Sequence, residues 1–177
     1  MIKKGIVLAG GTGSRLNPLT KAVNKQLLPI HDKPMIFYPL SVLMLANIRN
    51  ILMIVNPGQI NNFQNLLGDG SRYGIKISFI TQDKPRGLPD AFNLGKKFIA
   101  NDNVALILGD NFFYGQSLTK KLEKSSTFNS GCTIFLKEVN NPQNFGIAKI
   151  KNNKFEKIIG KTKTVYFKKC DYWFILF

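Results

Sequence analysis

A glycine-rich loop directly after an apolar run is the first part of the chain that could do chemistry. Residues 6–9 are apolar, three of the four residues at 10–13 are glycine, and Arg15 follows. A buried strand that ends in a tight glycine loop can bring backbone amides against a phosphate, because glycine accepts a positive φ and leaves no Cβ in the way. Arg15 would add the fixed fork of guanidinium donors that suits a polyphosphate. A purely structural turn is the alternative, since Leu16 stands where the dinucleotide-binding fingerprint needs its third glycine.

Two further polar side chains stand at the ends of predicted strands. Gln82 closes a strand predicted over 76–82, and Asp110 comes just after an apolar strand at 104–108. Ligands of open α/β sheets bind outside the carboxyl ends of the strands, so we expect both residues to converge with the glycine loop. The Asp110 carboxylate suits Mg²⁺ that bridges phosphate oxygens, and the Gln82 amide could read the edge of a base. A helix cap or turn is the alternative for Asp110, and an ordinary strand end is the alternative for Gln82.

Hydrophobic periodicity predicts alternating strands and helices, and this alternation is typical of a doubly wound α/β fold with a mostly parallel, Rossmann-like sheet. Strands are expected at 2–9, 51–55, 76–82, 104–108 and 132–139, with basic strand-like segments at 146–150 and 155–159. Helices are expected at 34–46, 60–67, 91–100 and 118–125, the first of them opened by Pro34.

Composition indicates one globular domain. The chain has 177 residues, of which 44% are hydrophobic, and no apolar stretch is long enough for a membrane span. The first strand begins within about five residues of the start, which leaves no room for a signal peptide. Cys132 and Cys170 provide no disulfide framework, so we expect a cytoplasmic protein.

The formal net charge of +15 is unusual and would suit a nucleic acid, an acidic membrane or small anionic substrates. The lysines are spread along the chain, however, and no nucleic-acid-binding module accompanies them. Much of the excess fits a genome with A/T-rich codons. We therefore expect neither a nucleic-acid nor a membrane partner.

Several motifs taken together resemble the sugar-phosphate nucleotidyltransferases, and within them the branch that transfers a thymidylyl group to glucose 1-phosphate. The motifs are LAGGTGSRLNPLT at 8–20, KQLLP at 25–29, KPMI at 33–36, YPLS at 38–41, LGDG at 67–70 and LGDN at 108–111. The resemblance covers residues 1 to about 161. It implies the nucleotide-diphospho-sugar transferase fold over 1–161, incomplete at the C-terminus, and a separate tail over 162–177.

The reaction that the resemblance implies joins dTTP and glucose 1-phosphate into dTDP-glucose and pyrophosphate with the help of Mg²⁺. Such an in-line phosphoryl displacement needs charge neutralisation and alignment more than a nucleophilic side chain. The resemblance gives catalytic roles to Arg15, Lys25 and Asp110, with the metal on Asp110; solvated surface charge is the alternative for the two cations. It gives nucleotide contacts to Leu8, Gly10, Gly11, Thr12, Gly13, Gln26, Gln82 and Gly87, and sugar-phosphate contacts to Gly146 and Lys161. It also implies that longer relatives form homo-oligomers.

The chain departs from the family pattern at three places around the expected ligands. Phe145 replaces a tyrosine before Gly146, and Pro89 removes a backbone donor beside the expected base pocket. Where the family has Glu-Glu-Lys-Pro, this chain has Ile-Gly-Lys-Thr at 159–162, so the lysine is kept and the carboxylate is lost. One lost charged hydrogen bond to the sugar costs about 1.5–3 kcal/mol.

The tail is the fourth departure, because residues 167–177 do not resemble the family. Back-translated with A/T-rich codons and shifted by one base, the tail gives Asn-Ala-Ile-Thr-Gly-Leu-Tyr, which is similar to the family's continuation. Our hypothesis is a frameshifted gene. It predicts that the tail from about residue 163 packs poorly and exposes Trp173 and Phe174. The chain would then also lack a second metal-binding aspartate of the family.

Other functions stay open on these observations. The same fold could use UTP or another sugar phosphate, or it could bind nucleotides without catalysis. A basic nucleic-acid binder is a further alternative, which a steep salt dependence of DNA affinity would single out.

Overall fold

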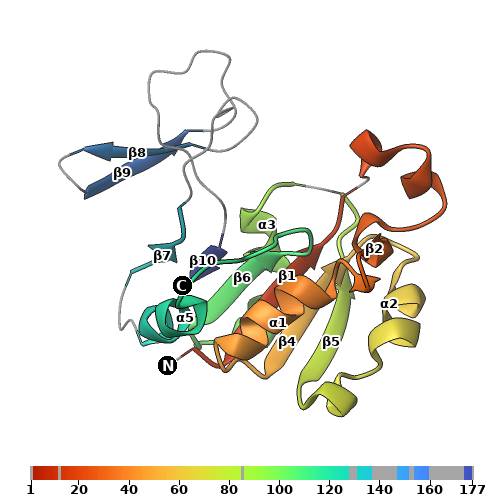
Figure 1. Cartoon of the computed structure of the whole chain (residues 1–177), viewed down its shortest axis with the longest axis horizontal. Coiled ribbons are helices and arrows are strands. Elements are labelled where there is room, and N and C mark those ends of the chain that lie inside the picture. Colours follow the sequence, from red (N-terminus) through yellow and green to blue (C-terminus); the bar gives the residue numbers. More distant parts are fainter. Residues whose placement is uncertain are drawn as a thin grey trace.

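The computed structural model describes residues 2–11, 13–84, 86–127, 131–136, 147–151, 154–159 and 174–176. Its main feature is a six-stranded sheet in the order β5-β4-β1-β6-β10-β7 (Figure 1). Four neighbouring strands run parallel: β1 (Lys4–Ala9), β4 (Asn50–Val55), β5 (Lys76–Thr81) and β6 (Val104–Leu108). In the registers of β1, Leu8 lies opposite both Ile54 and Leu108, so these strands end at the same edge. The mostly parallel sheet is as predicted.

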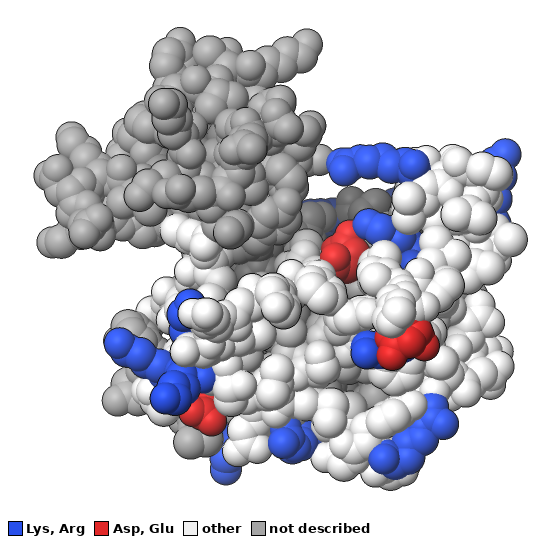
Figure 2. Space-filling view, viewed as in Figure 1, with Lys and Arg blue, Asp and Glu red and all other residues white. Residues whose placement is uncertain are grey.

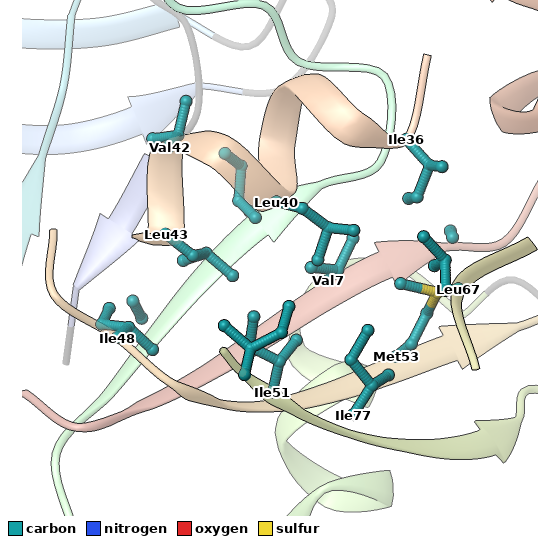
Figure 3. Packing of buried hydrophobic residues seen from close by; sticks show 14 of the residues in the cluster. Val7, Ile36, Leu40, Val42, Leu43, Ile48, Ile51, Met53, Leu67 and Ile77 are labelled. Carbon is teal, nitrogen blue, oxygen red and sulfur yellow. The ribbon is translucent and has the colours of Figure 1, made fainter. Parts of the chain in front are cut away.

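Helices cover both faces of this sheet, which confirms the doubly wound architecture. On one face lie α1 (Phe37–Leu45), α2 (Ile60–Leu67) and α5 (Leu118–Ser126), and on the other lie α3 (Pro89–Leu94) and α4 (Lys96–Ile99). Figure 3 shows Leu40 and Leu43 of α1 above Val7 of the sheet. The neighbouring Ile6 points into the opposite cluster, beside Ala91 of α3. Alternate strand residues are therefore buried on both faces, as expected for continuous apolar strands under two helical layers.

The chain before α1 is extended, not helical, so the prediction that Pro34 opens a helix is wrong. Lys33–Pro34 (β3) pairs antiparallel with Pro29–Ile30 (β2). The next two residues form the turn that leads into α1; their N–H groups still donate backward, Met35 N–H to the Leu28 carbonyl at 2.9 Å and Ile36 N–H to the Gln26 carbonyl at 2.9 Å. Helical backbone angles therefore begin only at Ile36, the residue before α1, and not at Pro34.

The helix predicted over 91–100 is divided at Gly95 into α3 and α4. A Cβ on Gly95 would lie 2.9 Å from the Ala91 carbonyl oxygen and 3.0 Å from Cδ1 of Ile6, so the missing side chain lets the helices approach β1. Pro89 is the first residue of α3. A helix does not use the N–H group at its first position, so the proline fits the start of α3. The loss of this N–H as a donor beside the expected base pocket stays a prediction.

The later segments form three further strand pairings. The two strand-like segments are strands, as predicted, and the structure pairs them: Ile147–Lys151 (β8) and Lys154–Ile159 (β9) form a separate antiparallel sheet. Phe174–Leu176 (β10) pairs antiparallel with β6 on one side and with Thr133–Ile134 (β7) on the other. The backbone of these three tail residues therefore joins the sheet, against our expectation for the tail, because they use the pairing groups of the β6 edge. The rest of the tail lies outside the described residues.

The described lysines and arginines are scattered over the face drawn in Figure 2, and several lie beside acidic side chains. On this face they form no continuous basic patch of the kind that follows a nucleic-acid backbone. Among the helices that the structure describes, none is long and apolar enough to span a membrane.

Candidate functional site

Four polar or glycine segments meet at the carboxyl edge of the parallel strands. The glycine loop follows β1, Asn56 follows β4, Gln82 follows β5 and Asp110 follows β6. Because the four strands are parallel and in register, their ends bring these residues together although the chain separates them widely. This edge is where open α/β sheets bind their ligands.

A cavity of about 250 Å³ lies at this edge. Its lining consists of Gly10, Gly11, Gly13, Ser14, Arg15, Leu16, Lys25, Gln26 and Asp110. Two cations face one carboxylate in this lining, so the cavity favours an anion. The sequence predicted seven of these residues as site residues; Ser14 and Leu16 are additions. Gln82 and Gly87 are outside the lining and Leu8 lies within β1, while Thr12, Gly146 and Lys161 are not among the residues that the structure describes.

The glycine loop is held by side chains on both sides. Gly11 N–H donates to Oδ1 of Asn56 at 3.0 Å, and Nδ2 of Asn56 donates back to the Gly11 carbonyl at 2.9 Å. At the other end, the Thr20 hydroxyl donates to the Gly13 carbonyl at 2.9 Å. Gly13 has a φ of 59°, and a Cβ there would lie 2.9 Å from Cγ2 of Thr20, so only glycine fits. The sequence analysis missed Asn56, although it follows an apolar strand just as Asp110 does.

Lys25 and Asp110 form an ion pair in the cavity, with 2.7 Å between Nζ and Oδ2. Their side chains are 28% and 35% exposed, so both are within reach of solvent and of a ligand. Lys25 begins a 3-10 turn (Lys25–Leu27) whose preceding residue, Asn24, accepts a hydrogen bond from Gln26 N–H at 2.9 Å. This cap fixes the turn and therefore the position of the lysine.

Gln26 is almost fully buried, with 3% of its surface exposed, between the cavity and the end of β6. A Cβ on Gly109 would lie 2.9 Å from Cγ of Gln26 and 3.1 Å from Cα of Ala9, so this glycine lets the three segments close up. Among the described residues, Oε1 of Gln26 has no hydrogen-bond partner. The side chain therefore keeps acceptor capacity beside the cavity.

Gln82 is also buried, with 4% exposed, and its Nε2 donates to Oδ2 of Asp90 at 2.8 Å. Arg86 lies next to this pair, with Nη1 3.6 Å from the same Asp90 oxygen and Nη2 2.7 Å from Oδ2 of Asp83. The hydrogen bond from Arg86 holds the pKa of the Asp83 carboxyl below its usual value. The sequence analysis missed Asp90, which belongs to the first turn of α3.

Gly87 has a φ of 91°, a backbone conformation that residues with a side chain rarely adopt, so the backbone alone accounts for a glycine at this position. A Cβ at this position would meet only Cδ of Pro89, at 3.7 Å. Close approach of a base to Gly87 therefore stays a prediction.

The carboxylate of Asp110 is the one acidic group in the cavity lining. Within the part of the chain that the structure describes, no three histidine, cysteine, aspartate or glutamate side chains gather into a cluster. A hard cation here would take one protein oxygen and find its other ligands on a bound molecule or water, which is a usual arrangement for Mg²⁺.

The chain is similar in sequence to known enzymes. A glucose-1-phosphate thymidylyltransferase of Neisseria meningitidis serogroup A is 55% identical over 150 residues, which are 85% of this chain and 52% of the relative. A protein of the same name from Xanthomonas campestris pv. campestris is 50% identical over 146 residues, which are 82% of this chain and 50% of that protein. The chain therefore spans about half the length of these relatives.

Solved structures show the same fold. A Bacillus anthracis protein described as a glucose-1-phosphate thymidylyltransferase, crystallised with sucrose, matches with a TM-score of 0.91 and 35% identity over 98% of this chain and 70% of its own. A UDP-glucose pyrophosphorylase in complex with UDP-glucose matches with a TM-score of 0.82 at 21% identity, over 99% of this chain and 76% of its own, and so shows the fold alone.

The sequence model of the family described as Nucleotidyl transferase matches residues 4–164. This range contains the parallel sheet, the glycine loop and every residue that lines the cavity. The chain belongs to the nucleotidyl transferase family.

Proposed function

We propose that this chain carries the nucleotide-binding part of a glucose-1-phosphate thymidylyltransferase, which converts dTTP and glucose 1-phosphate into dTDP-glucose and pyrophosphate. The observation that carries the proposal is the single cavity in which the glycine loop, Arg15, Lys25 and Asp110 meet. The names of relatives at 50% to 55% identity support the choice of substrates.

The proposed reaction is one displacement at the α-phosphorus of the nucleotide. A phosphate oxygen of the sugar phosphate forms a bond to this phosphorus, while the bond to the bridging oxygen of the pyrophosphate breaks. Backbone N–H groups of the glycine loop and the guanidinium of Arg15 would neutralise the leaving pyrophosphate. The ammonium of Lys25 would neutralise the phosphates that react.

Asp110 would hold Mg²⁺, because its carboxylate is partly exposed and is the acidic group of the cavity lining. When bound, this ion would supply further positive charge on the phosphate oxygens. When no ligand is bound, Lys25 and Asp110 neutralise each other. When the substrates bind, this ion pair would open and both side chains would turn toward the substrates. Opening a pair that is this exposed costs only about 0–1 kcal/mol, which ligand contacts easily exceed.

Of the residues expected to bind the nucleotide, all but Thr12 belong to the part of the chain that the structure describes. The expected sugar-phosphate residues, Gly146 and Lys161, belong to segments that the structure does not describe, and the family carboxylate beside Lys161 is replaced. We therefore propose that nucleotide binding persists where turnover is weak or lost. Assay of the purified chain with glucose 1-phosphate, dTTP and Mg²⁺ tests turnover, and the same assay with UTP tests the alternative base.

Arg15→Ala is expected to weaken dTTP binding about tenfold in calorimetry with Mg²⁺, because it removes a charged hydrogen-bond donor from the cavity. Arg72→Ala is the matched control. It removes another exposed arginine, from the turn Ser71–Tyr73 that precedes the amino end of β5, and should leave dTTP binding unchanged. Equal binding by Arg15→Ala and the parent chain would remove the role that we give to the loop arginine.

A further inference from the structure

The side chain of Gln82 lies between α3 and the glycine loop, and its two amide ends have different neighbours. Nε2 donates to Oδ2 of Asp90 at 2.8 Å. Oε1 lies 3.1 Å from the position that a Cβ on Gly10 would occupy. Gly10 is itself a residue of the cavity lining. The oxygen therefore faces the loop that borders the cavity, while the nitrogen faces away from it.

Asp90 decides which way this amide is turned. The oxygen and nitrogen of a glutamine are told apart only by their partners, and a carboxylate can only accept hydrogen bonds. The NH₂ group must therefore face Asp90. The Asp90 side chain is only 11% exposed and lies 3.6 Å from the guanidinium of Arg86. A hydrogen bond to a charged, largely buried carboxylate is stronger than one between neutral groups, so it resists a flip of the amide.

We propose that Asp90 is a positioning residue that locks the amide of Gln82 with its acceptor oxygen toward the nucleotide, and so selects a base that offers an N–H donor. This proposal rests on the proposed function, because it assigns the base of the nucleotide to the Gln82 end of the site. The imide N3–H of thymine or uracil would donate to Oε1. A cytosine in the same place would turn the lone pair of its N3 toward Oε1, and two acceptors repel each other.

A structural role for Asp90 makes a different prediction. An acidic residue in the first turn of a helix stabilises that helix through its charge, whatever ligand is bound. Loss of such a role would lower the thermal stability of the chain and leave the choice of base unchanged. Loss of the positioning role would change the choice of base.

The test uses Asp90→Asn, which keeps the size of the side chain but can donate as well as accept, so that the Gln82 amide is free to flip. Calorimetry with dTTP and with dCTP gives the ratio of their dissociation constants for each protein. We expect the preference for dTTP over dCTP to fall about tenfold in Asp90→Asn, the effect of one oriented hydrogen bond. Asp83→Asn is the control, because Asp83 contacts Arg86 but not Gln82, and it should keep the parent ratio.

A second measurement does not depend on the variant. In the nuclear magnetic resonance spectrum of the unmodified chain, the side-chain NH₂ protons of Gln82 should exchange slowly and show the shift of a hydrogen bond to a carboxylate. Rapid exchange of both protons would overturn the assigned orientation. If the unmodified chain prefers dTTP and Asp90→Asn keeps that preference, the inference alone fails. If the unmodified chain binds neither nucleotide, the proposed function fails and the base selection fails with it.

Discussion

Asp110→Asn is expected to abolish the Mg²⁺ dependence of dTTP binding and to lower the affinity measured with Mg²⁺ by about 100-fold. The neutral amide no longer attracts a cation, and the other lining residues offer no acidic replacement. The fold should survive, because Asp110 stands beyond the end of β6 and its side chain is 35% exposed. We expect the free energy of unfolding to change by about 1 kcal/mol or less. Calorimetry with and without Mg²⁺, together with urea unfolding, measures both quantities.

Asp102→Asn is the matched control for this variant. Asp102 also forms a 2.7 Å ion pair with a lysine, Lys4, but this pair lies at the amino end of β1, at the opposite edge of the sheet from the cavity. Its replacement should leave dTTP binding and the Mg²⁺ dependence unchanged. Full Mg²⁺ dependence in Asp110→Asn would show that Asp110 is a turn residue and that the proposed metal role is wrong.

Phe63→Ala is expected to lower the free energy of unfolding by about 3–5 kcal/mol. The ring is completely buried between α2 and the sheet, in the same cluster as Leu67 of that helix. Domains of this kind are stable by about 5–15 kcal/mol in total, so this one change removes a large part of the stability. Urea unfolding followed by circular dichroism gives the value directly.

Phe112→Ala provides the comparison, since it removes the same side chain from the surface. Phe112 is 58% exposed, and its ring packs on Tyr38 with 4.8 Å between centroids. Its loss should cost about 1 kcal/mol or less. Similar losses at the two positions would mean that α2 does not pack on the core as the structure shows.

The parallel sheet could be predicted because its strands are continuous apolar runs, and such runs are buried under any arrangement of the helices. The glycine loop and Asp110 could be predicted because each follows such a run. The residues at which helices begin and end could not be predicted as well, since they depend on contacts with residues elsewhere in the chain. Pro34 looked like a helix start, but the pairing of β2 with β3 holds it in an extended chain.

The partners of the site residues could not be predicted from the sequence. Asn56 forms two hydrogen bonds with the backbone of Gly11 because β4 ends beside β1, and the order of the strands in the sheet decides that they are neighbours. Asp90 meets Gln82 because the first turn of α3 returns to the residue that follows β5. Periodicity places residues on a face of a strand or helix, whereas these contacts depend on how separate elements are arranged in space.

The position of β1 in the sheet has a consequence for how the protein folds during synthesis. β1 is made first, yet its two neighbours come much later, since Lys4 pairs with Asn50 on one side and with Val104 on the other. At about 5–20 residues per second, the second edge of β1 waits about 5–20 s for its partner. During that time a nearly continuous apolar strand has unpaired backbone groups, which invite pairing with other chains. Slow synthesis should therefore favour aggregation of this protein, and chaperones that cover the nascent N-terminal half should oppose it.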